Sequence, residues 1–174
     1  MVERPNVVTF KGKPLTLVGL EVKAGQTAPP FKVVGKDMAD ISLESFPAKV
    51  VVLSVAPSLD TPVCALQTRT FNKEAVSLSD GVVVLSVSLD LPFALARFCG
   101  AEGISRVVVA SDYKYRTFGE SYGVHIRELG LLARAVFVLD KNRKVTHVEY
   151  VSEVTSEPNY ASALKAVKTA LGHV

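Results

Sequence analysis

The chain has 174 residues, enough for one domain with a well-filled core, and its 48% apolar and 21% charged residues are typical of a folded globular protein. The net charge is only +3 and no basic run alternates with aromatic residues, so nothing favours a nucleic acid as partner. The first residues lack the basic start and apolar stretch of a signal peptide, and no apolar run approaches the ~20 residues of a membrane-spanning helix. We therefore expect a cytoplasmic protein without membrane attachment.

The first predicted element is a small N-terminal hairpin at about residues 7–17. Residues 7–10 and 15–17 have strand patterns, and Lys11-Gly12-Lys13 between them is a turn sequence. A stretch rich in Gly and Pro follows, and a short strand is predicted at 31–34.

The central region alternates between strand and helix patterns. Residues 49–55 form an almost continuous β-branched run, which is typical of a strand buried on both faces. Apolar residues then recur at helical spacing over 62–78. The remaining predicted elements are, in chain order, a strand at 82–87, a helix at 92–99 ended by Gly100, strands at 107–110 and 133–139, a turn at 140–142, a strand at 144–151 and a helix at 158–171.

This order of elements predicts the fold class. Alternating strands and helices, followed by a hairpin and a terminal helix, indicate an α/β sheet covered by helices on both faces. The arrangement matches a thioredoxin-like fold, with a central mixed sheet flanked by helices and here an extra N-terminal β-hairpin. No repeat or linker interrupts the pattern, so we expect residues 1–174 to form a single domain.

The two cysteines are the candidate reactive residues. In the cytoplasm a disulfide framework is not expected, so they are more readily catalytic, metal-bound or simply buried. A zinc site is not supported, because no histidine falls at ligand spacing from either cysteine. The residues concerned are Cys64, Cys99, His125, His147 and His173.

Cys64 lies where a helix is predicted to begin. Thr61 is a favourable N-cap and Pro62 a favourable first residue, which makes Cys64 the third residue of the helix. A thiolate there would lie beside unpaired backbone N–H groups and the positive end of the helix dipole, and both stabilise this reactive form. The alternative, from the residues alone, is that Cys64 is a small buried residue of an amphipathic helix.

Two motifs resemble one family. Residues 57–64, in which Pro57, Thr61 and Cys64 fit the pattern PxxxTxxC, resemble the active-site signature of the peroxiredoxins. The string Ser-Leu-Asp-Thr-Pro-Val-Cys at 58–64 is similar to the thiol peroxidase subfamily in particular. So is Leu-Pro-Phe-Ala-Leu-Ala-Arg-Phe-Cys-Gly-Ala-Glu-Gly at 91–103, where that subfamily carries its second cysteine. The resemblance extends over nearly the whole chain, the hairpin included.

The resemblance implies a function and a role for each matched residue. Cys64 would be the peroxidatic cysteine, which cleaves the O–O bond of a hydroperoxide and becomes a sulfenic acid. Thr61 would hydrogen-bond the thiolate and the peroxide, Pro57 would shield the site from water, and the family's active-site arginine falls on Arg134. Cys99 would form an intramolecular disulfide with Cys64, which thioredoxin or a similar dithiol protein reduces. The resemblance also implies no bound cofactor and a homodimer.

Arg134 and Cys99 each allow a plainer interpretation when they are considered without the family. Arg134 lies in the apolar run 131–139, so it is either on an exposed strand edge or buried against an anion such as a thiolate or a departing alkoxide. Cys99 alone is most simply a buried cysteine. Together with Cys64 it becomes a thiol that captures the sulfenic acid.

Two other functions stay open at this point. A redox sensor would consume peroxide only stoichiometrically, whereas a peroxidase turns over when reductant is supplied. A disulfide oxidoreductase would reduce protein disulfides without peroxide, although the chain has no Cys-x-x-Cys motif. For the homodimer, the candidate residues on a face near the active site are Tyr115, Phe118 and Tyr122.

Overall fold

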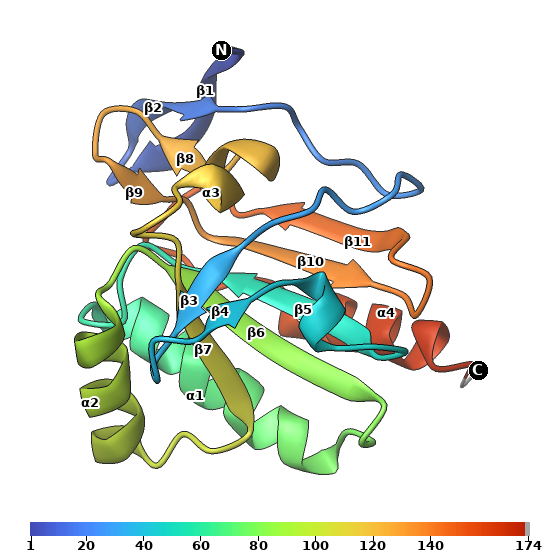
Figure 1. Cartoon of the computed structure of the whole chain (residues 1–174). Coiled ribbons are helices and arrows are strands. Elements are labelled where there is room, and N and C mark those ends of the chain that lie inside the picture. Colours follow the sequence, from blue (N-terminus) through green and yellow to red (C-terminus); the bar gives the residue numbers. More distant parts are fainter. Residues whose placement is uncertain (173–174) are drawn as a thin grey trace.

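The computed structural model describes residues 1–172, and its centre is a seven-stranded mixed sheet (Figure 1). In spatial order the strands are β11 (Val145–Tyr150), β10 (Ala135–Leu139), β5 (Val50–Val55), β6 (Val82–Ser88), β7 (Val107–Ser111), β3 (Val33–Gly35) and β4 (Asp40–Ile41). The strands β5, β6 and β7 are parallel, whereas β10 and β3 run antiparallel to their neighbours. All six residues of β5 are buried, as its β-branched run predicts.

The long helices all lie on one face of this sheet. They are α1 (Pro62–Ser77), α2 (Pro92–Glu102) and α4 (Tyr160–Ala170), which confirm the helices predicted in these regions. Their apolar residues share one core cluster with one set of strand residues, such as Val50 and Val52. No helix within residues 1–172 is both long and apolar enough to span a bilayer.

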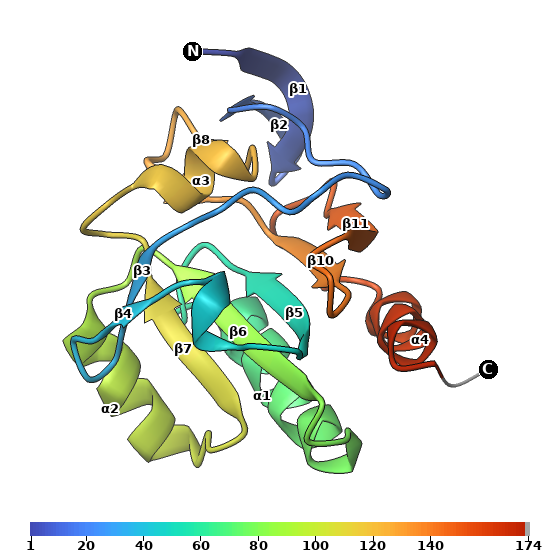
Figure 2. The ribbon, with the colours of Figure 1, turned by 45° about the vertical axis from the view of Figure 1, so that its right-hand side comes forward.

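The opposite face of the sheet also carries a helix, as expected, but only the five-residue α3 (Thr117–Ser121). The N-terminal hairpin covers the rest of this face, as Figure 2 shows. The alternate strand residues, Leu53 among them, pack there with Leu15 and Leu17 of the hairpin. Because the hairpin already covers these apolar side chains, a long helix is not needed on this face. A short 3₁₀ turn, η1 (Leu43–Ser45), adds Leu43 to the same cluster.

The hairpin belongs to a second, four-stranded sheet. Its strands, in spatial order, are β1 (Glu3–Phe10), β2 (Lys13–Val18), β8 (His125–Ile126) and β9 (Leu131–Leu132). The predicted strands at 7–10 and 15–17 are confirmed, and both extend further. Strands β8 and β9 were not predicted, because two residues are too few to show a strand period.

Helix α2 ends later than predicted. Gly100 lies inside the helix, and Gly103 is the C-cap in the left-handed region with a φ of 64°. The backbone N–H groups of Gly103 and Ile104 both donate to the carbonyl oxygen of Cys99. Glycine adopts this conformation without a Cβ clash, so the later glycine ends the helix. Cys99 therefore lies in the last full turn of α2 rather than at its end.

Two of the three aromatic candidates for a dimer face lie in the core instead. Phe118 and Tyr122 have no exposed surface, and their rings stack with centroids 4.6 Å apart. Phe31 packs against both rings edge-on. Tyr115 is partly exposed, and its hydroxyl bonds the carboxylate of Asp40. The prediction that Phe118 and Tyr122 contribute to a dimer surface is therefore wrong, because the apolar face of the sheet opposite α1 buries them.

Candidate active site

Two loops at one edge of the sheet carry the predicted site. Strands β5 and β6 are parallel and in register, with Val55 opposite Val87, so the loops that follow them leave the sheet at the same edge. One loop leads to α1 and the other to α2. Each helix has a proline in its first turn, where the fixed φ and the missing N–H are tolerated. The chain therefore starts both cysteine-bearing helices side by side.

Cys64 is the third residue of α1 and has no exposed surface. Thr61 is the N-cap residue, as predicted, but its hydroxyl donates to the carbonyl oxygen of Ser58 at 2.8 Å instead of capping the helix. Within residues 1–172 no hydrogen bond joins Thr61 to Cys64. Pro57 is buried just after β5. The loop from Pro57 to Thr61 therefore immediately precedes the thiol, with the hydroxyl of Thr61 turned back onto its own loop.

The buried side chain of Arg134 is hydrogen-bonded to this thiol and to two neighbouring oxygen atoms. Its side chain is 2% exposed, and its Nη2 donates to the Cys64 Sγ at 3.4 Å. Nη1 donates to Gln67 Oε1 at 2.7 Å, while Nε and Nη2 donate to the Val154 carbonyl oxygen at 3.0 and 2.8 Å. Across residues 1–172 no carboxylate forms an ion pair with Arg134. The exposed-edge interpretation is thus wrong, and the buried cation faces a group that becomes an anion on losing its proton.

Gln67 is a site residue that the sequence analysis missed. It lies one turn after Cys64 on α1 and has no exposed surface. Its oxygen accepts from Arg134, and its Nε2 donates to Ser54 Oγ at 2.7 Å. A buried amide bonded at both ends orients the guanidinium beside the sulfur. The signal was the helical spacing, since residues three apart share one face of a helix.

Asp90 was also missed, and it joins the two loops. Its Oδ1 accepts from Ser58 Oγ at 2.6 Å, and its Oδ2 accepts from the Leu59 N–H and from Ser88 Oγ, both at 2.8 Å. Ser58 and Leu59 precede Cys64, whereas Asp90 itself lies just before α2. One carboxylate therefore ties together the segments that lead to the two cysteines. No local pattern could show this, because the partners come from different loops.

Cys99 is buried at 4% exposure and is not bonded to Cys64. Both cysteines belong to the core cluster beneath α1, α2 and α4. Burial raises the pKa of the Cys99 thiol above its ordinary value, because the interior disfavours a thiolate, and the charge of Lys36 opposes this only in part. In this reduced state Cys99 is a protonated core residue.

Comparison with known proteins places the chain in a family. The Redoxin family model matches residues 23–164. The thiol peroxidase of Bacillus subtilis is 54% identical over 161 residues, which cover 92% of this chain and 96% of that protein. This chain is a redoxin of the thiol peroxidase group. The thiol peroxidase of Clostridium acetobutylicum is 49% identical and covers similar shares of both chains, 94% and 98%.

Solved structures agree with the redoxin fold. A peroxiredoxin-like protein from Aquifex aeolicus superposes with a TM-score of 0.89 at 46% identity, over 95% of this chain and 97% of that one. The thiol peroxidase from Chromobacterium violaceum has a TM-score of 0.83 at 21% identity, over 94% and 96%. The second likeness shows the fold alone. The thioredoxin-like α/β fold with flanking helices is thereby confirmed.

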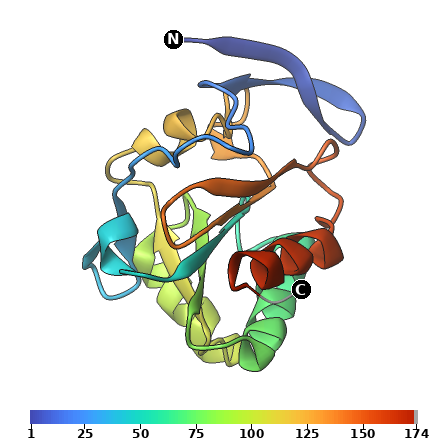
Figure 3. The same cartoon turned by 90° about the vertical axis from the view of Figure 1, so that its right-hand side faces the viewer.

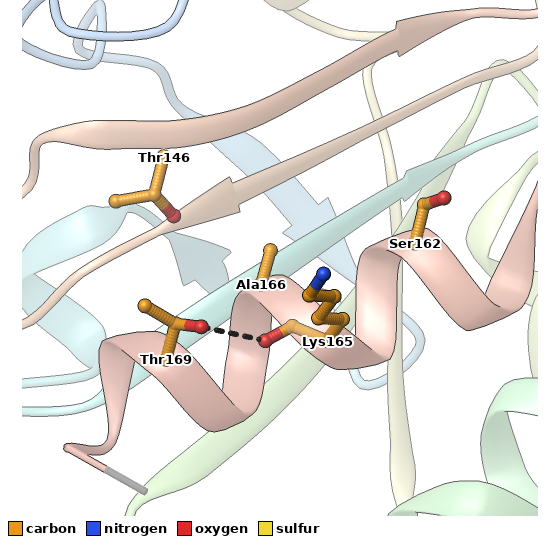
Figure 4. Close-up of a pocket in the computed structure, with 5 residues that line it drawn as sticks. All are labelled: Thr146, Ser162, Lys165, Ala166 and Thr169. Carbon is orange, nitrogen blue, oxygen red and sulfur yellow. Dashed lines mark hydrogen bonds between the residues drawn. The ribbon is translucent and has the colours of Figure 1, made fainter. Parts of the chain in front are cut away.

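The described part of the redoxin also has shallow hollows beside α4, away from the loops that lead to Cys64 and Cys99. A shallow pocket of about 250 Å³ between β11 and α4 is lined by Thr146, Ser162, Lys165, Ala166 and Thr169 (Figure 4). It contains no thiol, imidazole or carboxylate, so it offers no redox chemistry. Within residues 1–172 no three potential metal-ligating side chains cluster, and His173 lies outside these described residues.

Proposed function

We propose that this redoxin reduces hydroperoxides with Cys64 as its nucleophile. The observation that carries the proposal is the hydrogen bond from the buried Arg134 to the Cys64 sulfur. The thiolate attacks one peroxide oxygen, the O–O bond breaks, and the other oxygen leaves as an alkoxide that takes up a proton. Cys64 is thereby oxidised to a sulfenic acid, while the peroxide is reduced to an alcohol, or to water from hydrogen peroxide.

Arg134 has the geometry to stabilise both charges in this step. One of its N–H groups already points at the sulfur, and its remaining acceptors are neutral oxygens of Gln67 and Val154. Its charge is therefore available to the thiolate and to the departing alkoxide beside a sulfur that has no exposed surface. We assign Pro57 to shielding the sulfur, in line with its burial, and Thr61 to binding the peroxide after its hydroxyl leaves Ser58.

Cys99 is the proposed resolving thiol. Its sulfur attacks the sulfenic sulfur and the S–O bond breaks, the thiol proton leaves with the hydroxyl group as water, and an intramolecular disulfide with Cys64 remains. Two observations support this pairing: both residues lie in one core cluster, and their helices start at the same edge of the sheet. A thioredoxin-type dithiol protein would restore both thiols by disulfide exchange.

Single-turnover kinetics of two variants test the assignment. Cys64→Ser should abolish peroxide consumption, because it removes the nucleophile. Cys99→Ser should consume one peroxide per chain and then stop as a sulfenic acid, which a dimedone-type probe and mass spectrometry detect. The reverse pattern would reverse the two roles.

Steady-state turnover separates the peroxidase from the two alternatives. With thioredoxin, thioredoxin reductase and NADPH supplied, a peroxidase consumes peroxide catalytically, and the double variant lacking both thiols serves as control. A redox sensor would stop at the stoichiometric amount. A disulfide oxidoreductase would reduce insulin disulfides without peroxide.

We also propose that residues 1–174 form a single domain. The protein is further proposed to be cytoplasmic and a homodimer. The cytoplasm keeps resting thiols reduced, as this mechanism requires. Exposed apolar side chains at the start of α2, Leu91 and Phe93, take the place of the buried aromatics as candidates for the dimer face. Light scattering at micromolar concentration should give twice the chain mass, and a non-reducing gel should give the single-chain mass. A monomer mass in light scattering would contradict the homodimer. A covalently linked dimer on the gel would contradict the intramolecular disulfide.

A further inference from the structure

The N-terminal hairpin is bonded to the segment that links β11 to α4. The Thr9 N–H donates to the Ser152 carbonyl oxygen at 2.7 Å, and the Val154 N–H donates to the Thr9 carbonyl oxygen at 2.8 Å. Figure 3 shows the turn of the hairpin, in dark blue, beside this orange-red segment. The two segments are far apart in the sequence, so this contact is tertiary.

Glu153 strengthens the same contact with its carboxylate. One oxygen accepts from the Gly12 N–H at 2.9 Å and from the Thr9 hydroxyl at 3.1 Å. The other accepts from the N–H and the hydroxyl of Thr155 at 2.8 and 2.7 Å. These donors lower the pKa of Glu153 to about 2, so the carboxylate is ionised at neutral pH. The hairpin and residues 153–155 are thus joined around one charge.

Val154 carries this contact into the active site. Its N–H is bonded to the hairpin, and its carbonyl oxygen accepts both Nε and Nη2 of Arg134. Val154 itself is 3% exposed. The same Nη2 donates to the Cys64 sulfur, so the position of that carbonyl sets how the guanidinium lies against the thiol. A displacement of the Val154 peptide would move the cation away from the reacting atoms.

We propose that Glu153, together with Thr9 of the hairpin, is a positioning element for Arg134. It touches no reacting atom and acts by holding the Val154 carbonyl against the guanidinium. The hairpin is thereby part of the catalytic architecture as well as the cover of one face of the sheet. This inference rests on the proposed role of Arg134 in peroxide reduction.

The chain contains a matched control for this proposal. Glu128 also anchors the hairpin, because its two carboxylate oxygens accept from the Thr16 N–H at 3.1 and 2.9 Å. Glu128 makes no bond to the segment 152–155 within residues 1–172. Glu153→Ala and Glu128→Ala therefore both loosen the hairpin, but only the first loosens the segment that holds Arg134.

The first readout is the second-order rate constant of Cys64 oxidation by hydrogen peroxide, measured by stopped flow. Glu153→Ala should lower it at least about tenfold, since a displacement of a positioning group by an ångström costs up to ~100-fold. Glu128→Ala should change this rate constant by less than about twofold, because sites that do not interact affect each other by no more than that. Glu153→Gln, which keeps one acceptor oxygen, should fall between wild type and Glu153→Ala. Equal losses in the Glu153 and Glu128 variants would overturn the proposal.

A double-mutant cycle separates positioning from general loosening. If Glu153 acts through Arg134, Glu153→Ala should change the rate by less than about twofold in an Arg134→Ala background. An undiminished loss in that background would overturn the inference. If Arg134→Ala alone leaves the rate unchanged, the proposed function of Arg134 fails instead. If Glu153→Ala does not fold, Thr9→Val serves instead, because it removes one donor to the Glu153 carboxylate. Thr9→Val should lower the rate in the wild-type background and leave it unchanged in the Arg134→Ala background.

Discussion

The replacement Arg134→Ala is the sharpest test of the catalytic site. It removes the N–H group 3.4 Å from the Cys64 sulfur together with the buried positive charge. Losing one preorganised donor to a developing anion costs about 10²–10³ in rate, or roughly 2.7–4 kcal/mol of transition-state stabilisation. Because the guanidinium also contacts the Cys64 sulfur, the reactivity of Cys64 towards an alkylating agent should fall in the variant as well.

The same replacement leaves two buried acceptors without a donor. These are Gln67 Oε1 and the Val154 carbonyl oxygen, at about 1–3 kcal/mol of unfolding free energy each unless water enters the vacated space. Arg134→Lys separates charge from geometry. It keeps a cation, but one ammonium cannot donate to the sulfur, the amide and the carbonyl with the planar fork of arginine. We expect the lysine variant to lie between alanine and wild type.

The assay is the stopped-flow rate of peroxide reduction, with the rate of iodoacetamide alkylation of Cys64 as a second measure of its reactivity. Urea unfolding of each variant shows that the protein is folded under the assay conditions. A folded Arg134→Ala variant that retains both the wild-type rate and the wild-type alkylation rate would refute the proposed role of Arg134. A loss of rate equal in the alanine and lysine variants would show that the geometry of the fork, and not the charge, is what matters.

Three further predictions concern the loops and the hairpin. At ~1.5 Å per residue, Cys99 lies roughly 7–8 Å further along α2 than Cys64 lies along α1, because Cys99 is the eighth residue of its helix and Cys64 only the third. A disulfide needs Cα atoms within about 7 Å, so oxidation should unwind residues near either cysteine. Hydrogen exchange should then show lower protection over 60–68 or 92–103 in the oxidised protein, and equal protection in both states would contradict this. Asp90→Ala removes three hydrogen bonds and should lower the unfolding free energy by about 1–3 kcal/mol in urea, whereas unchanged stability would show that the bonds contribute nothing. Glu153 has a folded pKa of about 2 against 4.5 ordinarily, so its contribution to stability is present above 4.5 and is lost as the pH falls towards 2. The stability difference between wild type and Glu153→Gln should therefore shrink over that range, and a difference independent of pH would contradict the assignment.

Local patterns in the sequence were sufficient for the longer elements and for placing the proposed nucleophile, Cys64, in the first turn of a helix. The β-branched run at 49–55 and the helical spacing after Pro62 depend on neighbours within a few residues, so they predicted β5 and α1 closely. Thr61 and Pro62 likewise placed Cys64 in the first turn, and the family motifs pointed to Cys99 and Arg134. These features are encoded within short segments, which is why one sequence reveals them.

The partners of the site residues could be seen only in the folded chain. Gln67, Asp90 and Glu153 bind groups that are distant in the sequence, and no local period records such contacts. Burial of Phe118 and Tyr122 was missed for the same reason, since an aromatic residue in a short element can face either the core or solvent. The placement of the hairpin across one face, with the long helices on the other, follows from which apolar surfaces meet when the whole chain packs.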